Sequence, residues 1–328
     1  MRLGREQRER AYRALSLARA LDERMWRLAR AGRAHFAVPC SGHEAIGVGY
    51  ALAMRAGVDW LAPHYRDLAA VLALGMSPRD VMLCFFSRPS DPNAHGRQPY
   101  AHFGSRALHV LSQQGPQPNH CSHGVGCAWG SKLLRDGSVT VIAFGDGGAQ
   151  KGEAHESMNV AAVHRLPCVF VVHRNGWTQS VARADQYATE TLVARAEGYG
   201  MPGIAVDGTD VEAMYAAASE AVERARRGDG PSLIDAACVR LMPNTSNDDD
   251  SRYRDGTELD EQRATRDPLV RARTLVDAEF AARVDAENAA AAEDAAAWAE
   301  AQPLGDPSTV FEHAYAPAAE ASNVAGVR

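Results

Sequence analysis

Residues 138–177 read SVTVIAFGDGGAQKGEAHESMNVAAVHRLPCVFVVHRNGW, and this stretch decides the fold class. It contains two short apolar runs, at residues 138–144 and 167–172. Continuous apolar runs of this length are typical of strands that are buried on both faces of a parallel sheet. Between them, residues 153–164 place Met158 and several alanines on one helical face. The stretch therefore predicts a strand–helix–strand unit with a right-handed crossover.

The flanking sequence extends this pattern in both directions. The first 30 residues carry apolar side chains at helical spacing, and residues 277–300 read as an alanine- and acid-rich helix. We expect an α/β fold, with a mostly parallel central sheet flanked by helices, an N-terminal helix and a C-terminal helical tail. We expect a single domain over residues 1–328, with an N-terminal helical arm over 1–40, a helical C-terminal extension over 257–328, and an extended conformation for the last twenty-odd residues. Further helices are expected at 44–54, 78–86, 119–134, 189–199 and 211–226, and further strands at 203–206 and 232–241.

Composition excludes several classes of protein. The 328 residues carry a net charge of −6, which argues against a nucleic-acid-binding surface. The six cysteines form no CxxC pair and are expected to be buried reduced thiols. No apolar run approaches the roughly 20 residues that span a bilayer, and Glu6 and Glu9 argue against a mitochondrial presequence. We expect a cytoplasmic protein with neither a membrane segment nor a nucleic-acid partner.

Polar residues follow both strands of the central unit. Asp146 comes directly after the first strand and Asn175 just after the second. Ligands bind outside the carboxyl ends of parallel strands, and neighbouring strands lie about 4.8 Å apart, so both side chains can reach one Mg²⁺ ion. Glycines 145, 147 and 148 would let backbone N–H groups approach a diphosphate. The alternative is a tight turn with a capping aspartate and a separate Asn-Gly turn. The pattern is neither GxGxxG nor a P-loop, because Lys151 and Gly152 are in the wrong order.

The GDG tripeptide, a helix containing Asn159, and Asn175 at this spacing resemble the thiamine-diphosphate motif. Most of the chain resembles the alpha subunits of 2-oxo acid dehydrogenases, and the segment at 95–104 is most similar to the branched-chain members. The other segments that carry the resemblance are SGHEA at 41–45, PHYRD at 63–67, RAEGYG at 195–200 and VDG at 206–208.

The resemblance implies a thiamine-diphosphate-binding fold with thiamine diphosphate and Mg²⁺ as cofactors. It implies that Mg²⁺ binds Asp146, Asn175 and the backbone carbonyl of Trp177. His173 stands where a basic residue often meets phosphate. Instead of contacting the cofactor, Tyr65 and Arg66 could belong to a surface ion pair, which is the alternative that the residues alone suggest. The cofactor-binding residues implied are Tyr65, Arg66, Gly115, Gln117, Gly145, Asp146, Gly147, Gly148, His173 and Asn175.

The chain departs from the family in the polar loop at 242–256. Family members carry a histidine there that assists acyl transfer, and the matching position is Asn244. Asparagine cannot shuttle a proton near neutral pH as histidine does. His64 is a candidate to replace it, so His64 and Asn244 are the catalytic candidates. The alternative for His64 is a partly exposed histidine at a strand end, with no special task.

The loop also contains three aspartates at 248–250, with Arg252 and Arg254 close behind. These charges either order the loop through ion pairs or form a solvated run.

The resemblance implies oxidative decarboxylation of a 2-oxo acid, branched-chain or related, and transfer of the acyl group to a lipoyl group, as in branched-chain amino acid catabolism. The partners implied are a beta subunit in an α₂β₂ heterotetramer and a lipoyl acyltransferase. Two alternatives remain. One is half of a non-oxidative thiamine-diphosphate enzyme, and the other is an impaired paralogue that binds cofactor or partner only.

Overall fold

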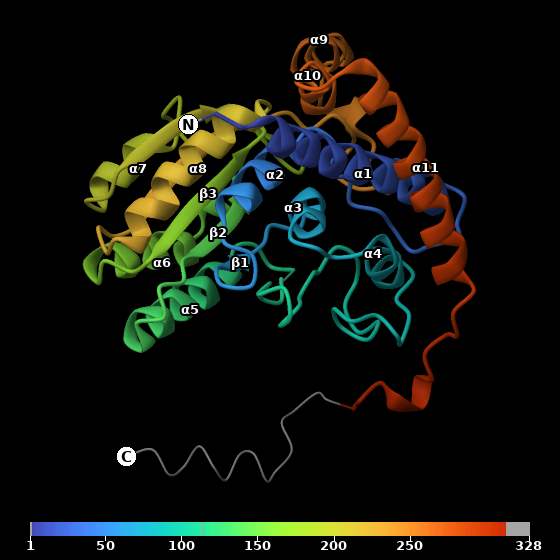
Figure 1. Ribbon diagram of the computed structural model, residues 1–328, viewed down its shortest axis with the longest axis horizontal. Coiled ribbons are helices and arrows are strands. Elements are labelled where there is room, and N and C mark those ends of the chain that lie inside the picture. Colours follow the sequence, from blue (N-terminus) through green and yellow to red (C-terminus); the bar gives the residue numbers. More distant parts are fainter. Residues whose placement is uncertain (1, 114, 313–328) are drawn as a thin grey trace.

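The computed structural model describes residues 2–113 and 115–312. Five strands form one sheet, and every neighbouring pair is parallel. The expected α/β fold with a parallel central sheet is thereby confirmed (Figure 1). The extended conformation expected for the last twenty-odd residues falls mostly outside the described residues. In their order across the sheet, the strands are β1 (Trp60–Ala62), β2 (Thr140–Gly145), β3 (Cys168–Arg174), β7 (Ser232–Ala237) and β6 (Gly203–Asp207).

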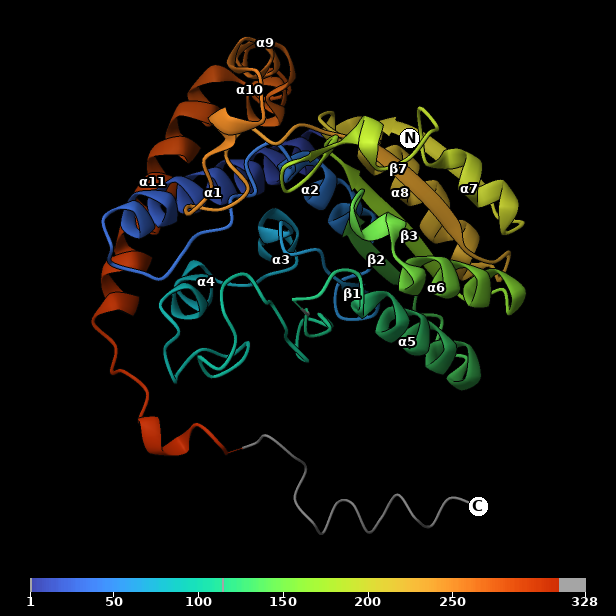
Figure 2. The same ribbon diagram turned by 180° about the vertical axis from the view of Figure 1, so that it is seen from behind.

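The sheet is buried on both faces, as the apolar runs indicate. Along β2, Val141 and Ala143 belong to one hydrophobic cluster, whereas Ile142 and Phe144 belong to another. This alternation follows from the period of two in a strand. Helices α2 (Glu44–Ala53) and α8 (Val211–Arg226) contribute to the first cluster, and α5 (His120–Leu134) and α6 (Gly152–Val163) contribute to the second. The two pairs of helices therefore cover opposite faces of the sheet. Figure 1 shows the sheet from one side, and Figure 2 shows it from the other side.

A layer of helices extends the first cluster away from the sheet. Helix α1 (Arg5–Arg30) buries Leu15, Leu21 and Met25. It packs along α11 (Ala278–Glu300), and Figure 1 shows the two helices running side by side. The layer is completed by α3 (Leu68–Ala73), α4 (Pro78–Phe85) and α10 (Pro268–Arg273).

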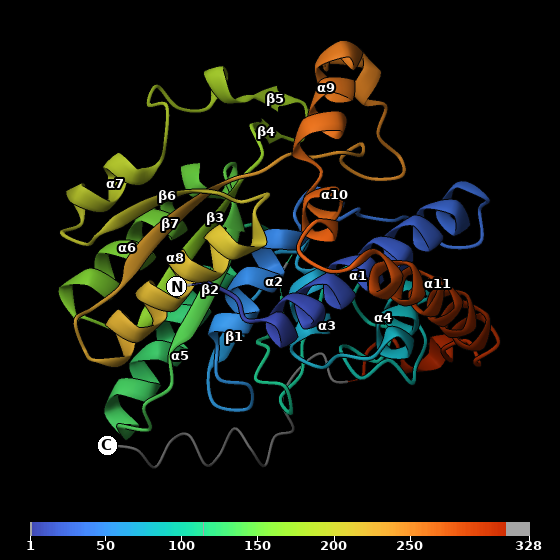
Figure 3. The same ribbon diagram turned by 45° about the horizontal axis from the view of Figure 1, so that its top comes forward.

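The remaining elements lie outside the five-stranded sheet. The hairpin of β4 (Trp177–Thr178) and β5 (Val181–Ala182) follows β3, and Figure 3 shows it beside α9 (Gly256–Arg266). The others are α7 (Val193–Gly198) and the 3₁₀ turns at Gly148–Gln150, Arg183–Asp185, Asp250–Arg252 and Pro307–Thr309.

Two expected elements are shorter in the structure. The strand expected at 232–241 ends at Ala237, because the chain then leaves the sheet, and Leu241 donates its N–H to the carbonyl of Ser41 at 3.2 Å. The helix expected at 189–199 begins only at Val193. The sequence analysis did not expect β1, α3, α9 or α10 as separate elements.

All six cysteines are free thiols and five of them are buried, which confirms the expectation for this residue type. Within the described part of the chain, no helix combines the length and the apolar character that a membrane crossing requires.

Candidate cofactor site

The ends of β2 and β3 bring Asp146 and Asn175 to the same edge of the sheet. Gly145 pairs with His173 in the parallel register, so the two segments leave the sheet side by side. The Oδ2 atom of Asp146 accepts a hydrogen bond of 2.8 Å from the N–H of Gly176. This bond ties the GDG turn to the turn that carries Asn175. The predicted juxtaposition is confirmed, and metal binding by these two residues stays a prediction.

The environment of Asp146 fits a cation. Its side chain is buried, and no basic side chain of the described residues forms an ion pair with it. Burial raises the pKa of this carboxyl group to about 7, although the N–H groups of Gly176 and Gly147 act in the opposite direction. A buried carboxylate is costly unless a cation or several hydrogen bonds compensate it. A divalent ion bound here would supply the missing positive charge.

The amide of Asn175 is held in one orientation. Its Oδ1 atom accepts a hydrogen bond of 2.9 Å from the backbone N–H of Trp177. Its Nδ2 atom lies 3.3 Å from Nε2 of His43. A carbonyl oxygen has two lone pairs, so Oδ1 keeps the capacity to bind an ion as well.

A cavity of about 470 Å³ opens at this edge. Most of the predicted site residues line it, from five separate parts of the chain. Those residues are His64, Tyr65, Gly115, Gln117, Gly145, Asp146, Gly147, Gly148, Asn175, Trp177 and Asn244. A Cβ atom added to Gly147 would lie 2.2 Å from Oγ1 of Thr178, so the hairpin after Asn175 packs directly on the GDG turn. This close approach requires glycine at position 147.

Arg66 and His173 do not line the cavity. The guanidinium group of Arg66 is buried and donates to the carbonyl of Pro39, and to O and Oδ1 of Asn244 at 3.1 and 2.8 Å. It therefore supports the loop at 242–256 from behind. The imidazole of His173 is fully buried between His43 and Asp67. In this arrangement neither side chain faces the cavity, and phosphate binding by either one stays a prediction.

The two catalytic candidates approach the cavity from different sides. His64 is 2% exposed, so the partly exposed position considered as an alternative is wrong. Burial, together with His173 and His43, lowers the pKa of His64 well below its ordinary value. The imidazole is therefore neutral, and because its Nδ1 atom accepts a hydrogen bond of 3.3 Å from the N–H of Arg66, the ring proton is on Nε2. Asn244 is anchored by Arg66, and its backbone N–H donates to Asp248 at 2.8 Å.

Lys151 is a lining residue that the sequence analysis did not select. It is the only lysine or arginine that lines the cavity in the described part of the chain, and it stands directly before α6. A positive side chain beside the N-terminus of a helix favours an anion such as a diphosphate. The signal in the sequence for this residue is its position directly before the helix that begins at Gly152.

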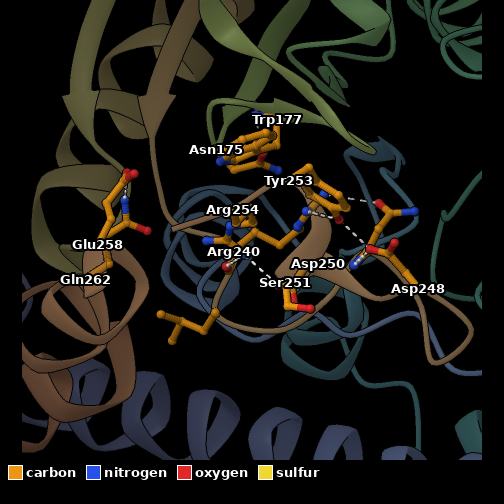
Figure 4. A network of polar contacts seen from close by, with 12 residues as sticks. Asn175, Trp177, Arg240, Asp248, Asp250, Ser251, Tyr253, Arg254, Glu258 and Gln262 are labelled. Carbon is orange, nitrogen blue, oxygen red and sulfur yellow. Dashed lines mark hydrogen bonds and ion pairs between the residues drawn. The ribbon is translucent and has the colours of Figure 1, made fainter. Parts of the chain in front are cut away.

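The loop at 242–256 is ordered by polar side chains. Arg240 donates to the hydroxyl of Tyr253 at 2.8 Å, that hydroxyl donates to Asp248, and Arg254 pairs with Asp250 at 3.2 Å. The ion-pair alternative is therefore confirmed for Arg254, whereas Arg252 forms no ion pair with the described residues. Figure 4 shows the ring of Trp177 beside Tyr253 and Arg254, with ring centroids of Trp177 and Tyr253 5.4 Å apart. The loop thus packs against the predicted metal-binding segment.

Comparison with known proteins gives a consistent result. Residues 12–308 match the model of the dehydrogenase E1 component family. The chain is 42% identical to the 2-oxoisovalerate dehydrogenase subunit alpha of Bacillus subtilis, over 79% of this chain and 78% of that protein. It is 40% identical to the 3-methyl-2-oxobutanoate dehydrogenase subunit alpha of Mycobacterium tuberculosis, over 81% and 69% of the two chains.

A third relative is named for a different substrate. The pyruvate dehydrogenase E1 component subunit alpha of Staphylococcus epidermidis is 35% identical over 82% of this chain and 70% of that protein. The parallel sheet, the site at the ends of β2 and β3 and these matches lead to one conclusion: the chain belongs to the dehydrogenase E1 component family, with alpha subunits as its relatives.

Proposed function

We propose that this chain is the alpha subunit of a 2-oxo acid dehydrogenase that acts on a branched-chain 2-oxo acid. The observation that carries the proposal is the buried carboxylate of Asp146, which has no ion-pair partner among the described residues and lies beside Asn175 at the rim of the cavity. The branched-chain substrate is favoured because the relatives with 40% identity or more are named for 2-oxoisovalerate and 3-methyl-2-oxobutanoate, two names for one compound.

Thiamine diphosphate and Mg²⁺ are the cofactors we propose for the cavity. Asp146, Asn175 and the carbonyl of Trp177 would hold the ion, and Gly147, Gly148 and Lys151 would face the diphosphate. When bound, thiamine diphosphate supplies a nucleophilic carbon for attack on the keto group and accepts the electron pair released with CO₂.

The protein side chains position the substrate and handle protons. The neutral imidazole of His64 lines the cavity and can hold a proton at its Nε2 atom, which would be the nearest neighbour of a Cβ atom added to Gly145. Phe36, Val38 and Tyr100 give the cavity an apolar part, which suits a branched aliphatic side chain and excludes water. Asn244 can orient a polar group by hydrogen bonding, but it cannot transfer a proton at neutral pH.

We further propose that the active enzyme is an α₂β₂ heterotetramer. The described residues contain one GDG-type edge, so a beta chain would supply the aminopyrimidine half of the cofactor site. A lipoyl-bearing acyltransferase would receive the acyl group. A second candidate is a paralogue that decarboxylates slowly or only binds the cofactor. Asn244 favours this candidate, because its side-chain oxygen already accepts a hydrogen bond from Arg66.

The test is co-expression with candidate beta chains, followed by an assay of decarboxylation with an artificial electron acceptor. We expect turnover of 3-methyl-2-oxobutanoate in preference to pyruvate, dependent on Mg²⁺ and thiamine diphosphate. The Asp146→Ala variant should be inactive, whereas Asp260→Ala, which changes an exposed aspartate of α9, should be active. Cofactor binding without turnover of any 2-oxo acid would favour the impaired paralogue. Absence of cofactor binding would refute both.

A further inference from the structure

Three buried histidines from separate segments meet beside the cavity, and one of them, His64, lines it. His43 precedes α2, His64 follows β1 and His173 lies near the end of β3. Each side chain is at most 2% exposed, and one ring nitrogen of each lies within 4.8 Å of those of the other two. Such a group either binds a metal ion or is joined by hydrogen bonds. The orientation of the rings distinguishes these possibilities.

The rings of His43 and His173 point at one another. Their Nδ1 atoms are 3.1 Å apart, their centroids are 5.4 Å apart, and their planes differ by 22°. This centroid distance is close to the largest that a 3.1 Å contact between ring nitrogens permits. The two nitrogens therefore face each other along one line, as in an N–H···N hydrogen bond, whereas ligands of a metal ion aim their lone pairs at a third point. The positive charges of Arg66 and Arg240 nearby also disfavour a cation here.

The amide of Asn175 determines which ring nitrogens of this cluster carry a proton. The N–H of Trp177 donates to Oδ1 of Asn175, so the NH₂ group faces Nε2 of His43. An amide NH₂ only donates, so Nε2 of His43 is the acceptor. Because Nε2 accepts this hydrogen bond it carries no proton, and the proton of the His43 ring is therefore on Nδ1.

The position of the proton on His43 determines the position of the proton on His173. His43 donates from Nδ1 to Nδ1 of His173, which leaves the proton of His173 on Nε2. Its Nε2 lies 3.2 Å from Oδ1 of Asp67. Hydrogen bonds thus lead from Asn175 through His43 to His173, and the carboxyl group of Asp67 lies beside the far nitrogen of His173.

We propose that His43, backed by His173 and Asp67, is a positioning residue that holds the amide of Asn175 with its oxygen available to the cation. The inference rests on the proposed function, in which Asn175 binds Mg²⁺. An amide rotated by 180° would present its NH₂ group to the ion, and only the hydrogen bonds around it oppose that rotation. His64 is not part of this series of hydrogen bonds, because its Nδ1 atom accepts a hydrogen bond of 3.3 Å from the N–H of Arg66.

The first test measures binding of Mn²⁺, used in place of Mg²⁺, to the α₂β₂ complex with thiamine diphosphate by electron paramagnetic resonance. His43→Leu should weaken binding roughly 10- to 100-fold, which is typical when a hydrogen-bond partner of a metal ligand is removed. His43→Gln should stay within a few-fold of the wild type, because its amide can accept from Asn175 and donate to His173. His120→Leu is the control, since His120 is equally buried but bonds to the carbonyl of Ala143. Unchanged binding in His43→Leu, or an equal loss in His120→Leu, would overturn the proposal.

The second test reads the protons directly, by nuclear magnetic resonance of the full chain labelled with ¹⁵N-histidine. We expect a proton on Nδ1 of His43 and on Nε2 of His173. The reverse tautomers combined with normal Mn²⁺ binding would overturn the positioning role alone. The expected tautomers without any Mn²⁺ binding would refute the proposed function, and the positioning role with it. One tightly bound zinc ion per purified chain would overturn the proposal in favour of a histidine metal site.

Discussion

The two sides of the cavity are built in different ways. The backbone of the edge that carries Asp146 and Asn175 is held by strand register and by the hydrogen bond between the N–H of Gly176 and Asp146. The loop at 242–256 has no strand partner and is held by side chains from distant parts of the chain, such as Arg66. A site of this kind therefore joins a rigid half, which local sequence specifies, to a half that depends on long-range side-chain contacts. The predictions below separate the two halves.

The largest effect is expected at the rigid edge. Asp146→Asn removes the only carboxylate of the predicted ion site and should weaken Mg²⁺-dependent binding of thiamine diphosphate by about 100-fold or more, comparable to the loss of several kcal/mol of charged contact. Isothermal titration calorimetry of the complex measures it. Hydrogen exchange in 242–256 should stay unchanged, and faster exchange there would show that the two halves are not independent.

The next effect concerns the buried guanidinium beneath the loop. Arg66→Leu leaves the carbonyls of Pro39 and Asn244 without their donor and should lower the free energy of unfolding by about 2–4 kcal/mol. It should also make residues 242–256 accessible to trypsin, which would cleave after Arg252. Denaturation in urea and limited proteolysis measure both effects. A loop that stays protected in this variant would contradict the role assigned to Arg66.

A smaller effect is expected from Tyr253→Phe. The change removes the hydroxyl that joins Arg240 to Asp248 while keeping the ring against Trp177. The loss should be about 1–2 kcal/mol, expressed locally in the loop. Hydrogen exchange by mass spectrometry should show faster exchange in 242–256 and no change in β2 and β3. Faster exchange in the strands as well would mean that the loop supports the edge.

The smallest effect is expected for Lys151→Met. Lys151 is exposed, so its attraction for a diphosphate is worth about 1 kcal/mol, or roughly a five-fold change in affinity. The difference between variant and wild type should shrink as salt is added, because exposed charges are screened. Titration at two ionic strengths provides the measurement. A difference that does not depend on salt would point to lost packing instead of lost charge.

The contrast between the halves also explains what the sequence could predict. Asp146 and Asn175 were placed correctly because each follows directly on an apolar run long enough to be recognised as a strand. Strand β1 was not expected, because three residues carry too little pattern to distinguish a strand from a turn. The position of Arg66 behind the cavity depends on Asn244, 178 residues away, and no local pattern encodes that contact. His43 appeared in a recognised segment, but its bond to Asn175 is visible only in three dimensions.

The most direct test of the central claim is anomalous diffraction from crystals of the α₂β₂ complex grown with thiamine diphosphate and Mn²⁺. We expect one strong manganese peak per alpha chain, bound by a carboxylate oxygen of Asp146, Oδ1 of Asn175 and the carbonyl of Trp177. A peak among His43, His64 and His173, or a cofactor bound with no manganese near Asp146, would contradict it.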